Sequence, residues 1–195
     1  MLLKRLNRER KIQAKKIDIL CNDLVAAHRQ FINKLNAISF KAAFYETIIS
    51  ITDINELLFR TATSIEQLFG RANAAFFLRQ RNGFKLHLFE SDRPISLGDK
   101  SLENCFSDEL VENICNSNRV CSLEDMLTMG LEANPTVLNR LSAFTIPLGQ
   151  FGTSEGFILI YRPADRKFTQ ADLDKICAVT DGLSAAIKSC RQPAG

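Results

Sequence analysis

The sequence has no tryptophan, only two histidines and no long apolar run. A membrane-spanning helix needs about 20 consecutive, mostly apolar residues, and no stretch of this chain approaches that length. The first residues, MLLKRLNRERKIQAKK, also lack the apolar middle of a secretory signal. We therefore expect a cytoplasmic protein without a transmembrane segment. Its 195 residues suit one domain of ordinary size with an additional segment.

Cysteine pairs with the spacing of a metal site are also absent. The six cysteines, at positions 21, 105, 115, 121, 177 and 190, include no CxxC pair. They are too scattered for the disulfide framework of a small secreted protein. We expect reduced, mostly buried thiols and no structural zinc site.

Positive charge is concentrated in one segment. Residues 1–16 carry seven lysines and arginines against the single acidic residue Glu9, whereas the rest of the chain has a small excess of acidic residues. The main body therefore offers no basic surface for nucleic acid, which is not an expected partner. The basic segment itself could lie on an anionic membrane or touch nucleic acid, and this adaptor role is an alternative.

Glycine and proline are absent from residues 1–40, so nothing in this segment interrupts a helix. Apolar residues recur there every seven positions, and a second series follows three positions later. The two series contain Leu3, Ile17, Leu24, Phe31 and Ile38, and Leu6, Leu20 and Ala27. Arg10, Gln13 and Lys34 interrupt the series, which is tolerable in a short dimerising helix or in one that packs partly on its own domain. We predict a basic, coiled-coil-like helix over 1–40 that forms a homodimer, followed by one domain over 41–195.

Two apolar stretches, ANAAFFLRQ and FKLHLFE, flank Arg81-Asn82-Gly83. An Asn-Gly pair between alternating runs is a strong hairpin signal, because both residues tolerate positive φ. The sequence therefore predicts two antiparallel strands joined by this turn.

The glycine-rich stretch IPLGQFGTSEGFILIY, residues 146–161, admits two interpretations. A phosphate-binding loop of the GxxxxGK[ST] type requires a helix directly after the loop and a lysine that reaches the phosphates. Neither is present, and Gly156 is followed by FILIYR, which is typical of a strand. We predict a β-hairpin in which the glycines serve turn geometry.

Helices are predicted around these strands. Asp53 and Thr169 are each followed three residues later by an acidic residue, the pattern of a capping box at a helix N-terminus. A helical insert is expected over 101–118. The expected order is two helices, two strands, the helical insert, three strands and a final helix. Short links between paired strands exclude crossovers, so the predicted fold class is α+β with a central antiparallel sheet.

Over about residues 42–190 the chain resembles the GAF family of sensory domains. The resemblance rests on Ile146-Pro147-Leu148, on Gly156 with the strand FILIY, and on Arg166-Lys167-Phe168-Thr169 leading through Asp172 into the closing helix. The family implies a profilin-like fold, similar in plan to PAS domains. Its central antiparallel sheet carries the terminal helices on one face and a lidded ligand pocket on the other. The resemblance also implies dimerisation through the terminal helices.

Alternation along the first hairpin predicts which side chains share a face of the sheet. We expect Phe76 and Leu78, with the even-numbered apolar residues of the second strand, to bury against the terminal helices. The other face would carry a mixture of apolar and polar groups beneath residues 95–138, as ligand pockets do. The predicted ligand-binding residues are Ala75, Phe77, His87, Phe89, Cys121 and Thr145. In this set His87 and Thr145 would form hydrogen bonds and the others an apolar wall.

Two groups of residues bear on metal chemistry. His87 could contact a ligand or an iron-bearing cofactor, but no second ligand lies near it in sequence. Asp108, Glu109 and Glu112 have helical spacing that brings carboxylates together, yet a solvated acidic face accounts for them without a metal. We predict no metal site and name no cofactor.

Cys105, Cys115 and Cys121 raise a redox alternative. The GAF family includes free methionine-R-sulfoxide reductase, which uses cysteines of the covering loop, and the separation of Cys105 and Cys115 is similar. The glycine-bearing surroundings of the enzyme's cysteines are absent here, and the local residues are acidic, which disfavours a reactive thiolate. The NKFDE-type motif of cyclic-nucleotide-binding members and the cysteine context of bilin-binding members are absent too.

Together these observations predict a non-catalytic, homodimeric GAF-like domain of signal transduction. It would sense a small molecule or contact a signalling protein, and it would transmit the event through its helical interface. The alternatives are the redox enzyme and the adaptor that uses its basic helix.

Overall fold

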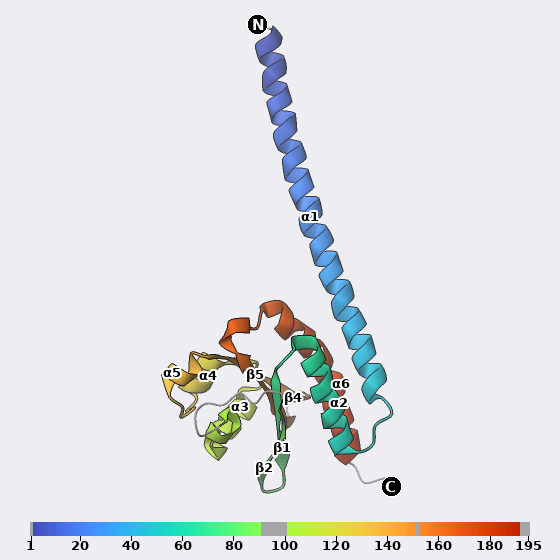
Figure 1. Ribbon diagram of the computed structural model, residues 1–195. Helices are drawn as coiled ribbons and strands as arrows, with labels where there is room; N and C mark the ends of the chain where they lie inside the picture. Colours follow the sequence, from blue (N-terminus) through green and yellow to red (C-terminus); the bar gives the residue numbers. More distant parts are fainter. Residues whose placement is uncertain (1, 91–100, 151–152, 192–195) are drawn as a thin grey trace. The chain divides into compact units, whose positions relative to one another are not determined.

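The computed structural model describes residues 2–90, 101–150 and 153–191. Residue contacts divide the chain into two compact units, 1–40 and 41–195. Helix α1 (Leu2–Ile48) begins in the first unit and ends in the second (Figure 1). No described helix combines the length and apolar character needed to cross a bilayer.

The first unit consists of α1 residues alone, and its large apolar side chains are exposed. On the seven-residue series, Leu24 is 71% exposed, Phe31 60% and Ile38 64%. Ile12 and Ile19, which lie on the opposite side of the helix by their spacing, are exposed as well. The predicted uninterrupted helix is confirmed, and within its own unit it buries none of these side chains.

The second unit is built on a five-stranded sheet in the order β2-β1-β5-β4-β3, in which every neighbouring pair is antiparallel. The strands are β1 (Asn73–Gln80), β2 (Gly83–Phe89), β3 (Cys121–Ser122), β4 (Leu141–Gln150) and β5 (Thr153–Pro163). The long central strands β4 and β5 pair along ten positions. The predicted α+β class with a central antiparallel sheet is confirmed.

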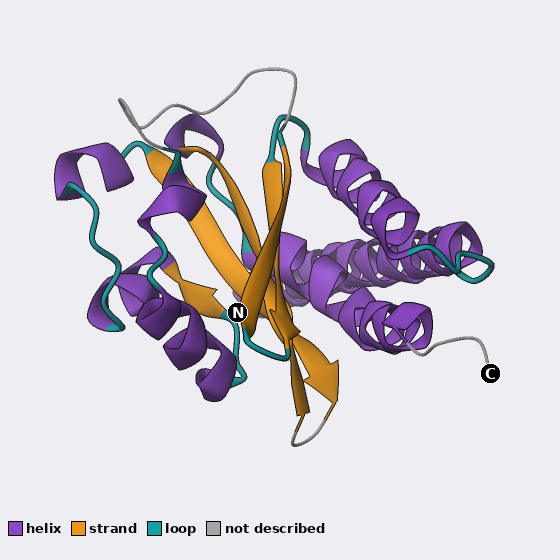
Figure 2. Cartoon of the chain, turned by 90° about the horizontal axis from the view of Figure 1, so that it is seen from below, coloured by secondary structure: helices purple, strands orange, loops and turns teal. Residues whose placement is uncertain are grey.

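Helices cover both faces of this sheet (Figure 2). One face carries α2 (Ile54–Phe69), α6 (Gln170–Arg191) and the last turns of α1. The other carries α3 (Asp108–Ser117), α4 (Leu123–Thr128) and α5 (Pro135–Leu138). Two short 3-10 turns complete the unit, η1 (Leu102–Cys105) and η2 (Ala164–Arg166). The first six residues of the expected cover, 95–100, lie outside the described residues.

The predicted N-cap residues begin α2 and α6, and the contacts at α6 form a reciprocal capping box, whereas at α2 the Glu56 carboxylate accepts from Arg60. Asp53 accepts a hydrogen bond from the Glu56 backbone N–H at 2.8 Å. Thr169 Oγ1 accepts from the Asp172 N–H at 3.3 Å, and the Asp172 carboxylate accepts from the Thr169 N–H at 3.0 Å. Each cap satisfies an N–H group that a helix start leaves without a partner.

The first hairpin is present, but its register differs from the expectation. Gln80 pairs with Gly83, so the loop contains only Arg81 and Asn82, and Phe76 lies opposite His87. The expected grouping of Phe76 with Leu86 and Leu88 implied a turn one residue longer. A slip of one residue moves every side chain of a strand to the other face, so the predicted faces of β2 are wrong throughout.

The glycine-rich stretch lies in the β4–β5 unit, where the two strands pair antiparallel as predicted. Gly156 has φ +135°, a conformation that L side chains rarely adopt, and a Cβ there would clash with the Phe77 carbonyl oxygen. The residue thus permits both a positive φ and the close approach of β1 to β5.

We call the sheet face that carries α2 and α6 the helix side. The core on this side is apolar, and Arg162 lies at its edge. Phe76, Ile158 and Ile146 form one row across β1, β5 and β4, and all are at most 1% exposed. Arg162 of β5 donates hydrogen bonds to the carbonyls of Phe69 and Lys167, both at 3.0 Å. The arginine therefore ties the end of α2 to the segment that precedes α6.

Candidate functional site

The residues predicted to line a pocket on the other face are mostly packed into a core. Ala75, Phe77 and Cys121 belong to a buried cluster with residues of η1, α3 and α4, and each is at most 5% exposed. The Phe77 ring stacks on Phe157 with a centroid distance of 4.7 Å. Side chains of this chain occupy the space expected for a ligand at these residues, and their contact with a ligand stays a prediction.

His87 and Phe89 lie on the helix side, so the expectation that they share a face with Ala75 and Phe77 is wrong. The Phe89 ring packs edge-on against Phe76, with a centroid distance of 5.7 Å. Burial, reinforced by the nearby charges of Lys85 and Arg191, lowers the pKa of His87. The cause of the error is the two-residue loop, because it reverses the orientation of every β2 side chain.

We call the sheet face that packs against α3, α4 and α5 the covered face. It contains a cluster of buried polar groups. Tyr161 donates a hydrogen bond to Glu103 at 2.6 Å and accepts one from the Asn73 side chain at 3.0 Å. Burial raises the pKa of Tyr161, which keeps the phenol protonated. Glu103 Oε1 and the predicted hydrogen-bonding group Thr145 Oγ1 are buried without hydrogen-bond partners in the described chain.

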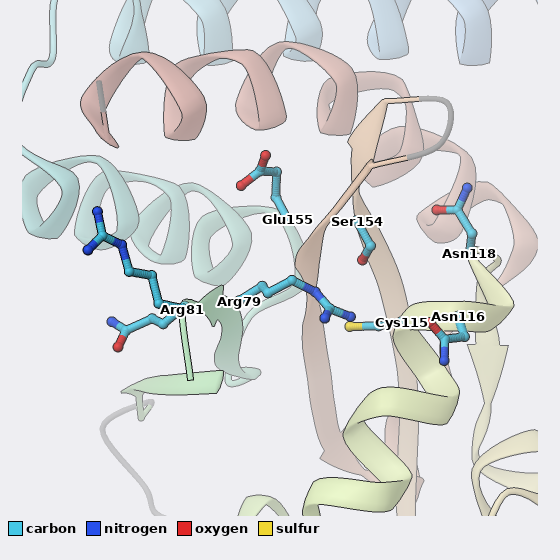
Figure 3. A pocket seen from close by; sticks show the side chains of 8 residues that line it. Arg79, Arg81, Cys115, Asn116, Asn118, Ser154 and Glu155 are labelled. Atoms are coloured by element: carbon cyan, nitrogen blue, oxygen red, sulfur yellow. The ribbon is translucent and has the colours of Figure 1, made fainter. Parts of the chain in front are cut away.

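A cavity of about 720 Å³ opens at the hairpin end of the same face. Its walls come from the end of β1, the following loop, the end of α3 and the start of β5 (Figure 3). The lining residues are Arg79, Gln80, Arg81, Cys115, Asn116, Asn118, Ser154 and Glu155. We call this space the donor cavity, because most of its lining side chains are hydrogen-bond donors.

Arg79 is held in a fixed position at the cavity wall. Its Nη2 donates to Glu112 Oε1 at 2.9 Å, and its guanidinium lies 4.9 Å from the centroid of the Phe84 ring. The hydrogen bond to Glu112 is the main reason why the pKa of Arg79 is raised. Only one guanidinium nitrogen is used by Glu112, so other N–H groups of Arg79 remain for a ligand.

Cys115 and Ser154 form the base of the cavity beside Arg79 (Figure 3). Burial raises the pKa of the Cys115 thiol, and the nearby Ser154 hydroxyl and Arg79 guanidinium offset this in part. The Ser154 Oγ is buried but makes no hydrogen bond of ordinary geometry with the described chain. An unsatisfied buried hydroxyl costs roughly 1–3 kcal/mol.

A β-bulge orients the start of β5. Gly149 pairs with Ser154 and Leu148 with Gly156, which leaves Glu155 as an extra residue between the two pairs. Consequently Ser154 is directed toward Cys115 while Glu155 is directed toward α6 (Figure 3). Glu155 Oε2 accepts a hydrogen bond from Arg191 of α6 at 2.7 Å. The bulge thus connects the donor cavity with the last helix.

The remaining candidates for redox or metal chemistry are three cysteines and the acidic group on α3. Cys105 lies in η1, half-buried, and Cys115 and Cys121 are buried. Of the acidic group on α3, Glu112 pairs with Arg79, whereas Asp108 and Glu109 are exposed in the first turn. No group of three or more potential metal ligands occurs among the described residues.

Sequence reasoning missed the donor cavity. Alternation along β1 predicts that Arg79 shares a face with Ala75 and Phe77, but the pattern of the GTSEG segment predicts only a turn and does not place Ser154 in a site. The local sequence pattern does not predict the bulge at Glu155, which directs the Ser154 side chain toward Cys115. The proximity of Glu112 to Arg79 depends on how α3 packs against the sheet, which spacing within α3 does not reveal.

A comparison with models of protein families finds no match, and a comparison with curated proteins finds no significant one. Solved structures with a similar fold do exist. The GAF domain of a phosphoenolpyruvate-protein phosphotransferase from Acinetobacter is 16% identical, with a TM-score of 0.57, and the match covers 78% of this chain and 92% of that chain.

The GAF domain/HD domain protein from Geobacter sulfurreducens is 17% identical, with a TM-score of 0.54, and the match covers 72% of this chain and 95% of that one. The GAF domain of a two-component sensor histidine kinase from Bacillus halodurans is 16% identical, with a TM-score of 0.50 and coverage of 71% and 95%. Identities this low establish the fold alone. The fold that the sequence resemblance implied is confirmed, and the chain is a GAF-like domain in its architecture.

Proposed function

We propose that this chain is a non-catalytic, cytoplasmic regulatory domain that senses a small molecule or a protein partner and signals through a helical homodimer interface. GAF domains of similar structure occur in a two-component sensor histidine kinase and in a phosphoenolpyruvate-protein phosphotransferase. These neighbours support a sensory or regulatory role for a domain with this fold.

The exposed stripe of α1 is the observation that carries the dimer part of the proposal. Leu24, Phe31 and Ile38 are at least 60% exposed and recur every seven residues. Such spacing lines one side of a helix and is typical of a helix that pairs with another. Complete burial of each such side chain would contribute about 1.5–3 kcal/mol, so a second copy of the helix would offset the ordering of the segment.

Signalling requires that a bound molecule favour one arrangement of the terminal helices over another. The contact between Glu155 at the donor cavity and Arg191 on α6 supports such coupling. Binding beside Ser154 would displace its neighbour Glu155 and so change how α6 is held. The output would be a change of helix packing in the dimer, passed to a signalling protein.

The surroundings of Cys115 argue against the redox enzyme. A nucleophilic cysteine needs a lowered pKa and access to solvent, whereas burial raises the pKa of Cys115 and its side chain is 2% exposed. We therefore expect no turnover of free methionine sulfoxide, and Cys105→Ser and Cys115→Ser variants should remove no activity.

Native mass spectrometry of the full chain, purified from its own host, tests the proposal. One chain has a mass of 21.9 kDa. We expect a species of twice that mass, together with the mass of any ligand that is retained. A single-chain mass at all concentrations, or turnover of methionine sulfoxide by the purified protein, would contradict the proposal.

A further inference from the structure

We propose that the donor cavity binds the anionic group of a small molecule, a carboxylate or a phosphate. This inference rests on the proposed function for small-molecule sensing, and it adds the place and the chemical class of the ligand. It concerns the hairpin end of the sheet, where Cys115, a member of the apolar cluster of Ala75 and Phe77, also lines the cavity.

Most of the polar side chains around the cavity can donate hydrogen bonds, and the two arginines can only donate them. Arg79 and Arg81 offer guanidinium N–H groups from β1 and its loop, and Asn116 and Asn118 offer amides from the end of α3. Neither amide forms a hydrogen bond within the described part of the chain. Guanidinium groups bind planar carboxylates and phosphates through two parallel hydrogen bonds, so two arginines at one cavity favour an anion.

The balance of charge points the same way. The two carboxylates near the cavity are already paired, Glu112 with Arg79 and Glu155 with Arg191. Arg81 is exposed and pairs with no acidic group of the described chain. Among the described residues, the two carboxylates are thus neutralised by Arg79 and Arg191, and the charge of Arg81 at the cavity margin is left for a ligand.

Ser154 supplies an independent observation. Its Oγ is buried at the base of the cavity, beside the Cys115 thiol, and makes no hydrogen bond of ordinary geometry within the described chain. Buried hydroxyls in folded proteins are nearly always hydrogen-bonded. The bulge at Glu155 turns this hydroxyl toward the cavity instead of toward α6. A ligand oxygen would accept its hydrogen bond and remove the cost of burying it unpaired.

The experiment uses the full chain and two probes, inorganic phosphate and succinate, followed by NMR of the arginine and asparagine side-chain N–H signals. We expect saturable shifts in Arg79, Arg81, Asn116 and Asn118 with at least one probe. The probe that binds more tightly distinguishes a phosphate ligand from a carboxylate ligand.

Two variants and one control test whether the cavity residues determine the affinity for the anion. Arg81→Gln should weaken binding roughly tenfold or more, as expected for a lost hydrogen bond from a charged group. Arg140→Gln removes the same charge from an exposed position outside the cavity, and it should leave the affinity unchanged. Ser154→Ala should weaken binding while the anion-free chain keeps or gains stability, because an unpaired hydroxyl is removed.

The inference is overturned if neither probe produces saturable shifts, or if both variants bind the probes as the parent chain does. It is also overturned if Arg140→Gln weakens binding as much as Arg81→Gln, which indicates general attraction to charge. Native mass spectrometry reports the dimer separately. A dimer without anion binding refutes only this inference, and anion binding by a single-chain species refutes only the dimeric signalling mechanism.

Discussion

The two ends of helix α1 differ in what happens to their apolar side chains. Between residues 41 and 48, Phe44 and Ile48 are 3% and 4% exposed, because the second unit provides their partners. Between residues 1 and 40, Leu24 and Phe31 are 71% and 60% exposed. Local helix preference is similar at both ends. One end of the helix is therefore stabilised by contacts within the chain, whereas the apolar side chains of the other end are exposed.

The largest expected effect concerns the second unit, residues 41–195, which contains the buried core. Gly156→Ala places a Cβ against the Phe77 carbonyl at φ +135°. We expect a loss of roughly 2–4 kcal/mol in the free energy of unfolding, measured by urea denaturation. The midpoint for this unit should fall at every protein concentration.

Gly83→Ala is the matched control for this prediction. Gly83 has φ +119° in the same sheet, but a Cβ there would meet no atom within 4 Å. Its substitution should cost about 1 kcal/mol from backbone strain alone. Equal losses for the two variants would show that the close approach of β1 to β5 at Gly156 has no energetic weight.

The second effect concerns the exposed part of α1, residues 1–40. Ile17→Glu combined with Leu24→Glu places like charges on the stripe of α1, where two copies would bring them together. We expect the dissociation constant of the dimer to rise by roughly 100-fold or more, measured by sedimentation velocity. The unfolding of residues 41–195 should be unaffected.

Ile12→Glu combined with Ile19→Glu is the control, because these two isoleucines have the same spacing and lie on the opposite side of α1. This variant carries the same added charge and should remain dimeric. If both double variants dissociate to the same extent, net charge, and not the stripe, determines association.

The third prediction concerns the end of α1 that packs within its own unit. A Cβ at Gly182 of α6 would clash with the Tyr45 ring, so Gly182→Ala should cost about 1–3 kcal/mol. Tyr45→Ala should remove most of that penalty in a double-mutant cycle. Strictly additive losses, measured by thermal unfolding, would indicate that the ring moves aside freely.

The smallest effect depends on pH. Burial, with Lys85 and Arg191, lowers the pKa of His87 below its value in the unfolded chain, which is about 6.5. The unfolded chain therefore binds the proton more readily, and the stability that neutral His87 permits declines as the pH falls below about 6.5. His87→Gln should flatten this part of the stability profile. His28→Gln, at an exposed position, should not change it.

The sequence predicted those features that depend on local pattern. Asp53 and Thr169 cap the helices they were expected to cap, and the segment around Gly156 forms a strand pair. These elements have strong local signals, and their neighbours in space are also neighbours in sequence.

Features that depend on a single residue of register or on contacts between distant elements were not predictable. His87 was placed on the wrong face because Arg81-Asn82-Gly83 is compatible with loops of two or three residues. The donor cavity was missed because it depends on the bulge at Glu155 and on the packing of α3 against β1. Neither feature has a marker in the pattern of apolar residues.

Amide hydrogen exchange of the full chain at high and low protein concentration tests the central claim most directly, which is that residues 1–40 are stabilised by a second copy. We expect amides between Ile17 and Ile38 to be protected at high concentration and to lose protection on dilution, while those of β5 stay protected throughout. Absence of protection in α1 at both concentrations, or protection that persists after dissociation to single chains, would contradict the claim.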